Sequence, residues 1–188
     1  MLALQVEDIR EFTKQLFMAE TFDRFLVQEA RVVTFSAFSV DGRLHQDFFT
    51  DEELEQARLE DYATWQMIRP FCFSLIKGKK LPESFHIILR LPPQGAVRFM
   101  AEHAPSLQPD ENVGLYINVR YEEKLLYCVT GVSLSQFTLD KSLERAWDEN
   151  VKRFLQKANI AVSDMSLMRF CAVQSRGIPV PAGRADMS

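Results

Sequence analysis

A cysteine and a basic cluster lie close together in the segment RPFCFSLIKGKK, residues 69–80. If a helix restarts at Pro70, Cys72 lies in the first turn of that helix. The free amides of that turn and the charge of Arg69 would then lower the pKa of the thiol and make Cys72 a reactive nucleophile. The alternative interpretation places Cys72 in the hydrophobic core. We prefer the second interpretation, because free cysteine is among the most buried residue types.

Three lysines, Lys77, Lys79 and Lys80, end the same segment. They do not belong to a phosphate-binding P-loop, because no glycine stands five residues before Gly78 and Lys79 is not followed by serine or threonine. One interpretation is an ordinary basic helix end, which suits the negative carbonyl terminus, and we prefer it. The other is a site for an anion or a partner, which would combine these side chains: Arg69, Lys77, Lys79, Lys80, His86 and Arg90.

The sequence carries no recognisable metal-binding or catalytic motif. No histidine stands in an HExxH pattern, and Cys72, Cys128 and Cys171 form no CxxC pair. No GxSxG or GxGxxG motif occurs, and no pair of catalytic carboxylates stands out. The sequence therefore predicts no metal site, no cofactor and no catalytic residue, although distant residues can converge after folding.

The first half of the chain contains a predicted helix and a predicted hairpin. Apolar residues at helical spacing predict a helix over residues 8–18. Residues 31–40 are rich in β-branched and aromatic side chains, which favours a strand. Asp41 and Gly42 form the strongest short hairpin signal, so residues 43–49 are expected to return as the partner strand.

A second helix of the first half contains the candidate residues. Thr50 and Glu53 match a capping box at the start of an acidic stretch. A helix is predicted over residues 62–77, with a kink or a restart at Pro70. Gly78 stands where a helix-terminating glycine is expected.

The second half of the chain has clearer periodicity. Its predicted elements are a strand, a helix, the two strands of a hairpin and a long helix, over residues 85–91, 93–103, 113–121, 124–133 and 141–158. In the hairpin, Cys128 falls on the apolar face of its strand. Cys128 is therefore predicted to be a core residue.

These elements together predict an α+β fold, a mostly antiparallel sheet with amphipathic helices packed on it. Residues 1–160 would form a single globular domain, and residues 161–188 an irregular C-terminal tail. A short strand is also predicted over residues 2–6. A strand, a helix and a hairpin therefore occur twice in order, so residues 1–80 and 81–160 are candidate halves of an internal repeat.

Two families resemble parts of this chain. The stretch FHIILRLPPQGAVRFM resembles the strand-into-helix opening of a sliding-clamp unit, which implies DNA binding through basic helices; the helices predicted here carry few basic residues. The stretches ETFDRFLVQEARVVTFSAFSVDG, RPFCFSLIKGKKLPESF and FTLDKSLERAWDENVKRFL resemble an uncharacterised bacterial domain-of-unknown-function family, family 5721 of that series, from anaerobic Firmicutes. That resemblance covers residues 1–160 and implies no activity, cofactor or site residue.

Composition narrows the class of protein. The chain has 188 residues, of which 47% are hydrophobic, so it can bury a core and is not disordered. A net charge of −4 argues against a dedicated nucleic-acid binder. No apolar run is long enough for a membrane span, and the acidic N-terminus does not match a signal peptide. Unpaired cysteines favour a reducing compartment, so we expect a cytoplasmic location and no contact with a membrane.

The function is not encoded in any motif, and three hypotheses remain. The preferred one is a non-catalytic cytoplasmic binding or interaction protein, whose partner would be another protein. The second is a nucleic-acid-associated protein with clamp-like halves. The third is a small-molecule enzyme centred on Cys72 or His86.

Overall fold

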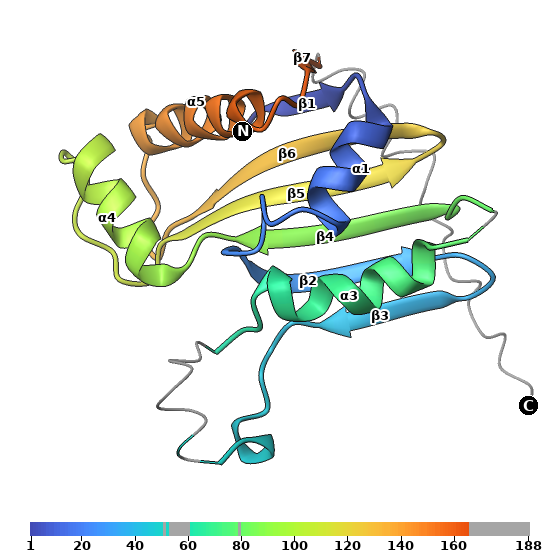
Figure 1. The fold of residues 1–188 in the computed structure, drawn as a ribbon. Helices are drawn as coiled ribbons and strands as arrows, with labels where there is room; N and C mark the ends of the chain where they lie inside the picture. Colours follow the sequence, from blue (N-terminus) through green and yellow to red (C-terminus); the bar gives the residue numbers. More distant parts are fainter. Residues whose placement is uncertain (51, 53–60, 79, 166–188) are drawn as a thin grey trace, which may run out of the picture.

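The fold is built on a central β-sheet, in whose longer strands buried and more exposed side chains alternate. The computed structural model describes residues 1–50, 52, 61–78 and 80–165. There, seven strands form one open antiparallel sheet in the order β3-β2-β4-β5-β6-β1-β7, with the helices packed against one face (Figure 1), so the predicted α+β class is confirmed. The strands are β1 (Ala3–Val6), β2 (Leu26–Val33), β3 (Ala37–Asp41), β4 (Ser84–Arg90), β5 (Gly114–Glu122), β6 (Leu125–Ser133) and β7 (Val162–Asp164).

The helices lie close to their predicted positions. They are α1 (Ile9–Phe17), α3 (Trp65–Ile76), α4 (Pro93–His103) and α5 (Ser142–Lys157), with a 3-10 turn η1 (Gln46–Phe48). α1 begins where the carboxylate of Asp8 accepts hydrogen bonds from the amides of Arg10 and Glu11. None of the helices in the described part is long and apolar enough to cross a membrane.

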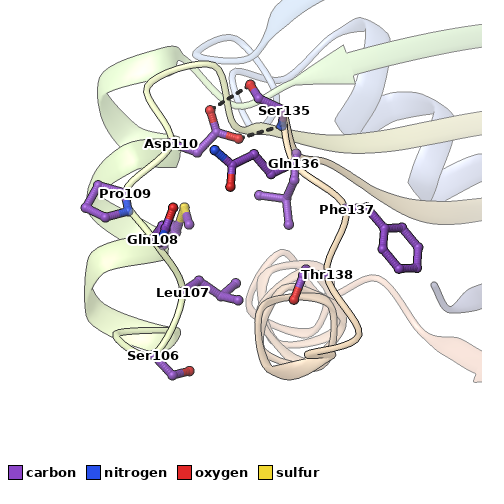
Figure 2. Close-up of a pocket in the computed structure, with 11 residues that line it drawn as sticks. Ser106, Leu107, Gln108, Pro109, Asp110, Ser135, Gln136, Phe137 and Thr138 are labelled. Carbon is purple, nitrogen blue, oxygen red and sulfur yellow. Dashed lines mark hydrogen bonds between the residues drawn. The ribbon is translucent and has the colours of Figure 1, made fainter.

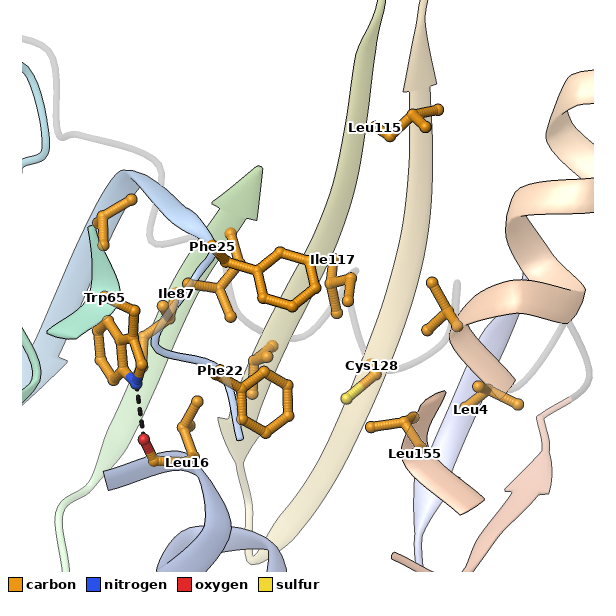
Figure 3. Packing of buried hydrophobic residues seen from close by; sticks show 14 of the residues in the cluster. Leu4, Leu16, Phe22, Phe25, Trp65, Ile87, Leu115, Ile117, Cys128 and Leu155 are labelled. Atoms are coloured by element: carbon orange, nitrogen blue, oxygen red, sulfur yellow. Dashed lines mark hydrogen bonds between the residues drawn. The ribbon is translucent and has the colours of Figure 1, made fainter. Parts of the chain in front are cut away.

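One hydrophobic core lies between the helices and the sheet (Figure 3). The predicted alternation of β4 is confirmed, because Phe85, Ile87 and Leu89 are buried in this core. Trp65 of α3 is fully buried, and its indole nitrogen donates a hydrogen bond of 2.6 Å to the carbonyl of Leu16. Because this bond satisfies the only polar group of the indole, Trp65 joins α1 to α3 without leaving an unpaired donor.

The predicted hairpin turn at Asp41 and Gly42 is wrong. β2 and β3 turn at residues 34–36 instead, and residues 43–49 form no strand beside them. Gly42 is required for close packing: a Cβ at this position would lie 1.7 Å from the carbonyl oxygen of Val27. No described glycine has a positive φ. The prediction assumed that Gly42 is needed for a positive φ in a turn, whereas it is needed because it has no Cβ.

Of the kink or restart predicted at Pro70, the restart is wrong. α3 begins at Trp65, later than predicted, and continues through Pro70. Proline disfavours helical geometry at the preceding Arg69, but the Arg69 guanidinium is bound to the carboxylate of Asp23 at 2.9 Å, which holds this turn in place. As a result, Cys72 lies in the interior of the helix and not in its first turn.

The second hairpin follows the prediction with a shift of one residue. β5 and β6 pair along their whole length, and the turn residues Glu123 and Lys124 have φ of 50° and 62°. Positive φ at two successive residues is typical of a two-residue hairpin turn. Cys128 is fully buried, as predicted.

The two predicted halves share an element order but not a pairing pattern. Each contains a strand, a helix, a hairpin and a further helix. However, β1 lies between β6 and β7, whereas β4 lies between β2 and β5. The internal repeat stays a prediction.

The predicted C-terminal tail contains one strand, because Val162–Asp164 form β7 beside β1. Residues 166–188 of that tail lie outside the described part of the chain. Two residues of the predicted capping box at 50–53 also lie outside it.

Candidate functional site

The sheet face opposite the helices carries a row of basic side chains. Side chains alternate along a strand, so the residues between the buried positions of β4 point to this face. Arg31 of β2, His86 of β4 and Arg120 of β5 are direct cross-strand partners there. The Cα atoms of the two arginines are about 10 Å apart, because neighbouring strands lie about 4.8 Å apart.

An arginine and a tyrosine form a second pair on the same face. Arg90 and Tyr116 are cross-strand partners, and the Arg90 Cζ lies 5.9 Å from the centroid of the Tyr116 ring. A Cβ at Gly114 would lie 2.4 Å from the Tyr116 hydroxyl oxygen, and one at Gly131 would lie 3.5 Å from the Tyr116 Cβ. The two glycines therefore leave room for the Tyr116 side chain along the sheet. We define the arginine face by these side chains: Arg31, His86, Arg90, Tyr116 and Arg120.

A fourth arginine, Arg43, lies beside another tyrosine. The Arg43 Cζ lies 5.9 Å from the centroid of the Tyr62 ring, and the Gln28 side-chain amide donates a 3.0 Å hydrogen bond to the Tyr62 hydroxyl. Hydrogen bonding to Arg43 lowers the pKa of Tyr62, and the charge of Arg90 lowers it further. Because Gln28 belongs to β2, this pair lies beside the strand that carries Arg31.

The arginines of this face have no acidic partner within the described residues. None of Arg31, Arg90 and Arg120 forms an ion pair there. Glu29 and Glu122 lie on the same face, two residues along their strands from Arg31 and Arg120. The charges of these arginines are therefore not neutralised by an ion pair in the described residues, although Arg120 also bonds the Tyr127 side chain and the two carboxylates reduce the positive potential around the arginines.

Part of the same sheet face is already buried. Ala3, Tyr127 and Val129 form a second small cluster there, against which Met165 packs. These residues come from β1 and β6, so the accessible part of the face lies over β2, β4 and β5.

His86 is held in its neutral form. Burial is the larger cause and the charge of Arg120 the smaller, and together they lower the pKa of His86 from 6.5 to about 4. The His86 Nε2 atom is buried and has no hydrogen-bond partner. A neutral imidazole between two arginines adds no further repulsion, and it leaves the two guanidinium groups as the charges of the row.

We expect the protein to lose stability as the pH falls from 6.5 to about 4, because His86 takes up a proton on unfolding in this range. The unfolded state then binds more protons, so the free energy of unfolding decreases, by about 2–3 kcal/mol in total. Urea unfolding at several pH values should show a smaller decrease for His86→Gln. Equal decreases in both proteins would contradict the lowered pKa.

Comparison with known protein families shows which family the chain belongs to. The model of a family of unknown function, DUF5721, matches residues 15–163. The chain belongs to DUF5721. This match confirms the family resemblance drawn from the sequence, and the matched region includes the whole arginine face. No curated protein and no solved structure matches the chain significantly, and the resemblance to sliding clamps stays a prediction.

In this DUF5721 member the side chains of the predicted anion site lie apart. His86 and Arg90 share the arginine face, two strand repeats apart on β4. Arg69 lies on α3, on the other side of the sheet, and is bound to Asp23 and to the carbonyl of Met18. The remaining members lie at the end of α3: Lys77 and Lys80 are exposed, and Lys79 is outside the described residues.

Cys72 lies in the hydrophobic core of this chain. Its side chain is fully buried, and this burial raises the pKa of Cys72 to about 11. Burial also raises the pKa of Cys128. Because a thiolate is disfavoured at both positions, we assign these cysteines to packing. Cys72 and His86 lie on opposite sides of the sheet, so they do not form a common centre.

A small hollow lies between the loop after α4 and the loop after β6 (Figure 2). Its volume is about 260 Å³. The carboxylate of Asp110 accepts hydrogen bonds from the amide and hydroxyl of Ser135, at 2.6 and 2.9 Å, and from the amide of Asn112 at 2.9 Å. These bonds lower the pKa of Asp110 and join the two loops. Asp110 therefore has a structural role, and we do not assign a ligand here.

Sequence reasoning missed three residues of the arginine face: Arg31, Tyr116 and Arg120. Tyr116 and Arg120 lie on the polar side of the strand predicted over residues 113–121, but only the apolar side of that strand was interpreted.

Among the described residues, no group of three or more histidine, cysteine, aspartate or glutamate side chains could hold a metal ion.

Proposed function

We propose that this protein acts by binding, without catalysis, and that its arginine face holds single-stranded nucleic acid. The observation that carries the proposal is the set of arginines without an ion pair, Arg31, Arg90 and Arg120, with Tyr116 beside Arg90, on the sheet face opposite the described helices. Arginine binds phosphate groups in a bidentate manner, and a tyrosine ring can stack on a base of any sequence. Within residues 1–50, 52, 61–78 and 80–165, the helices cover only the other face of the sheet, which supports this face as the place for an extended ligand.

The charge of the molecule sets the expected strength of binding. The chain carries a net charge of −4, and Glu29, Asp41 and Glu122 lie on or at the edge of the arginine face. These acids repel a polyanion, so we expect weak binding that depends steeply on salt and little on sequence.

We propose that the protein is bacterial and cytoplasmic. The two free, buried cysteines support a location in a reducing compartment.

The other hypotheses receive less support. An enzyme centred on Cys72 or His86 would have to use a thiol whose pKa burial raises to about 11, or an imidazole whose pKa is lowered to about 4. Neither group is suited to proton transfer near neutral pH. A protein partner on the arginine face would use the same arginines and tyrosine. A surface that is specific for a protein would not bind an oligonucleotide, so an oligonucleotide binding experiment separates the two kinds of partner.

The proposal predicts that three arginines control oligonucleotide binding. Fluorescence anisotropy with a labelled oligothymidylate of about 12 nucleotides, at about 25 mM salt, should show saturable binding. In the variant Arg31→Gln, Arg90→Gln, Arg120→Gln, the slope of log K against log salt should decrease in magnitude by about 2, because each lost phosphate contact removes about 0.7 from it.

Two lysines just after α3 provide the control. Lys77→Gln with Lys80→Gln removes exposed charge away from the arginine face, so it should leave the salt slope nearly unchanged. Absence of binding by the unsubstituted protein at low salt would refute the proposal. Loss of the slope in the lysine variant, with retention in the arginine variant, would also refute it and would favour the end of α3.

A further inference from the structure

A second hollow lies on the helical side of the sheet, between α1 and the end of α3. Its volume is about 520 Å³, within the range of small-molecule sites. The rings of Phe85 and Tyr121, stacked with centroids 5.2 Å apart, line it from the sheet. Ile9 of α1 and the α3 residues Phe73 and Ile76 add further apolar surface. The hollow is independent of the arginine face, which lies on the other side of the sheet.

The charged residues that line this hollow are all basic. Among the described lining residues these are Arg10, Lys14 and Lys124, and each is exposed. Lys14 has a neighbouring carboxylate, Glu11 at 3.5 Å, which does not line the hollow. A partly buried apolar floor with exposed cations at the rim is complementary to a ligand with an apolar chain and one negative end.

The surface beyond this rim has the opposite charge. An adjoining hollow shares Lys124 and is lined by Glu83, Glu122 and Glu123. These carboxylates would repel the negative end of a ligand there. The head group is therefore directed toward Arg10 and Lys14 at the α1 side.

We propose that this hollow binds a long-chain carboxylate, a free fatty acid in chemical class. The aliphatic chain lies over Phe85 and Tyr121, and the carboxylate lies at the rim beside Arg10 and Lys14. The apolar chain supplies most of the binding free energy, and the cations select an anionic head group over a neutral or cationic one.

Binding should depend on chain length and on the charge of the head group. Decanoate and dodecanoate, below their micelle concentrations, should shift the NMR signals of the Met18 and Ile76 methyl groups, which line the hollow. Affinity should increase by about fourfold for each added methylene. Hexanoate and dodecyltrimethylammonium should bind far more weakly. Equal binding of the cationic amphiphile, or no dependence on chain length, would overturn the proposal.

Two variants test the two parts of the site. Arg10→Gln with Lys14→Gln should weaken dodecanoate binding by about fivefold, because two exposed charges are lost. Thr13 lines the hollow while its hydroxyl bonds the Ile9 carbonyl of its own helix, so Thr13→Phe should fill the space and abolish binding without altering the circular dichroism.

The matched control is Lys157→Gln at the end of α5, which removes an exposed charge outside the hollow and should leave dodecanoate affinity unchanged. Full dodecanoate affinity in a folded Thr13→Phe protein would refute the site. An equal loss in Lys157→Gln would refute the role of the rim. The arginine-face variant should keep dodecanoate binding, so failure of one proposal is distinguishable from failure of the other.

Discussion

Replacing Gly42 with alanine is expected to lower the free energy of unfolding by about 3 kcal/mol or more, which is the upper end of over-packing effects. The added Cβ would lie 1.7 Å from the carbonyl oxygen of Val27 and 2.6 Å from its carbonyl carbon. Both are backbone atoms of β2, so a rotamer change cannot relieve the contact. The segment after β3 would have to move away from β2, which would break the hydrogen bond from Ala63 to the carbonyl of Gly42 at 2.7 Å.

Gly78 offers a matched control for Gly42→Ala. A Cβ at Gly78 would have no atom within 4 Å, and no described glycine has a positive φ. Gly78→Ala should therefore raise the free energy of unfolding by less than about 1 kcal/mol, because alanine restricts the unfolded chain more than glycine does. Urea denaturation of both variants measures the difference. Equal stability of the two variants would show that the close approach at Gly42 is relieved without cost.

Replacing Arg69 with methionine is expected to cost about 3 kcal/mol of unfolding free energy, the second large effect. Arg69 donates to the Asp23 carboxylate at 2.9 Å and to the Met18 carbonyl at 3.0 Å. The side chain of Asp23 is 9% exposed, so the substitution would leave a nearly buried carboxylate without its cation. The free energy of unfolding from urea or thermal denaturation is the measurement.

A double substitution separates the loss of the pair from the loss of packing. The Asp23 Oδ1 and the Arg69 Nε are buried without hydrogen-bond partners, so the pair is incompletely satisfied. Asp23→Leu added to Arg69→Met should recover more than half of the lost stability, because no buried charge then remains. Lys77→Met, at the exposed position that caps the end of the same helix, should cost less than about 0.5 kcal/mol. A stable Arg69→Met single variant would show that the pair has no structural role.

Local signals were sufficient for most of the elements. Alternation over residues 85–91 predicted a strand with one buried face, and the apolar stripe over 141–158 predicted α5. These predictions succeed because the periods of a strand and of a helix are properties of the backbone itself. The turn at Asp41 and Gly42 failed because glycine meets two different needs, positive φ and lack of a Cβ, which the sequence does not distinguish.

The candidate site was predicted only in part. His86 and Arg90 were named from the sequence, but they were grouped with Arg69 and the lysines near it in the chain. The fold places Arg69 on the other side of the sheet and brings Arg31 and Arg120 beside His86. Sequence distance is a poor guide here, because β2, β4 and β5 are neighbours in the sheet but are separated by helices in the chain.

The sequence by itself determined which side of the strands in the second half is apolar, where the main helices lie and that Cys72 and Cys128 belong to the core. Only the tertiary structure decided which polar residues of different strands meet. The physical reason is that the direction of a side chain depends on its own backbone, whereas its cross-strand neighbour depends on register. Register is set by packing between segments far apart in the chain.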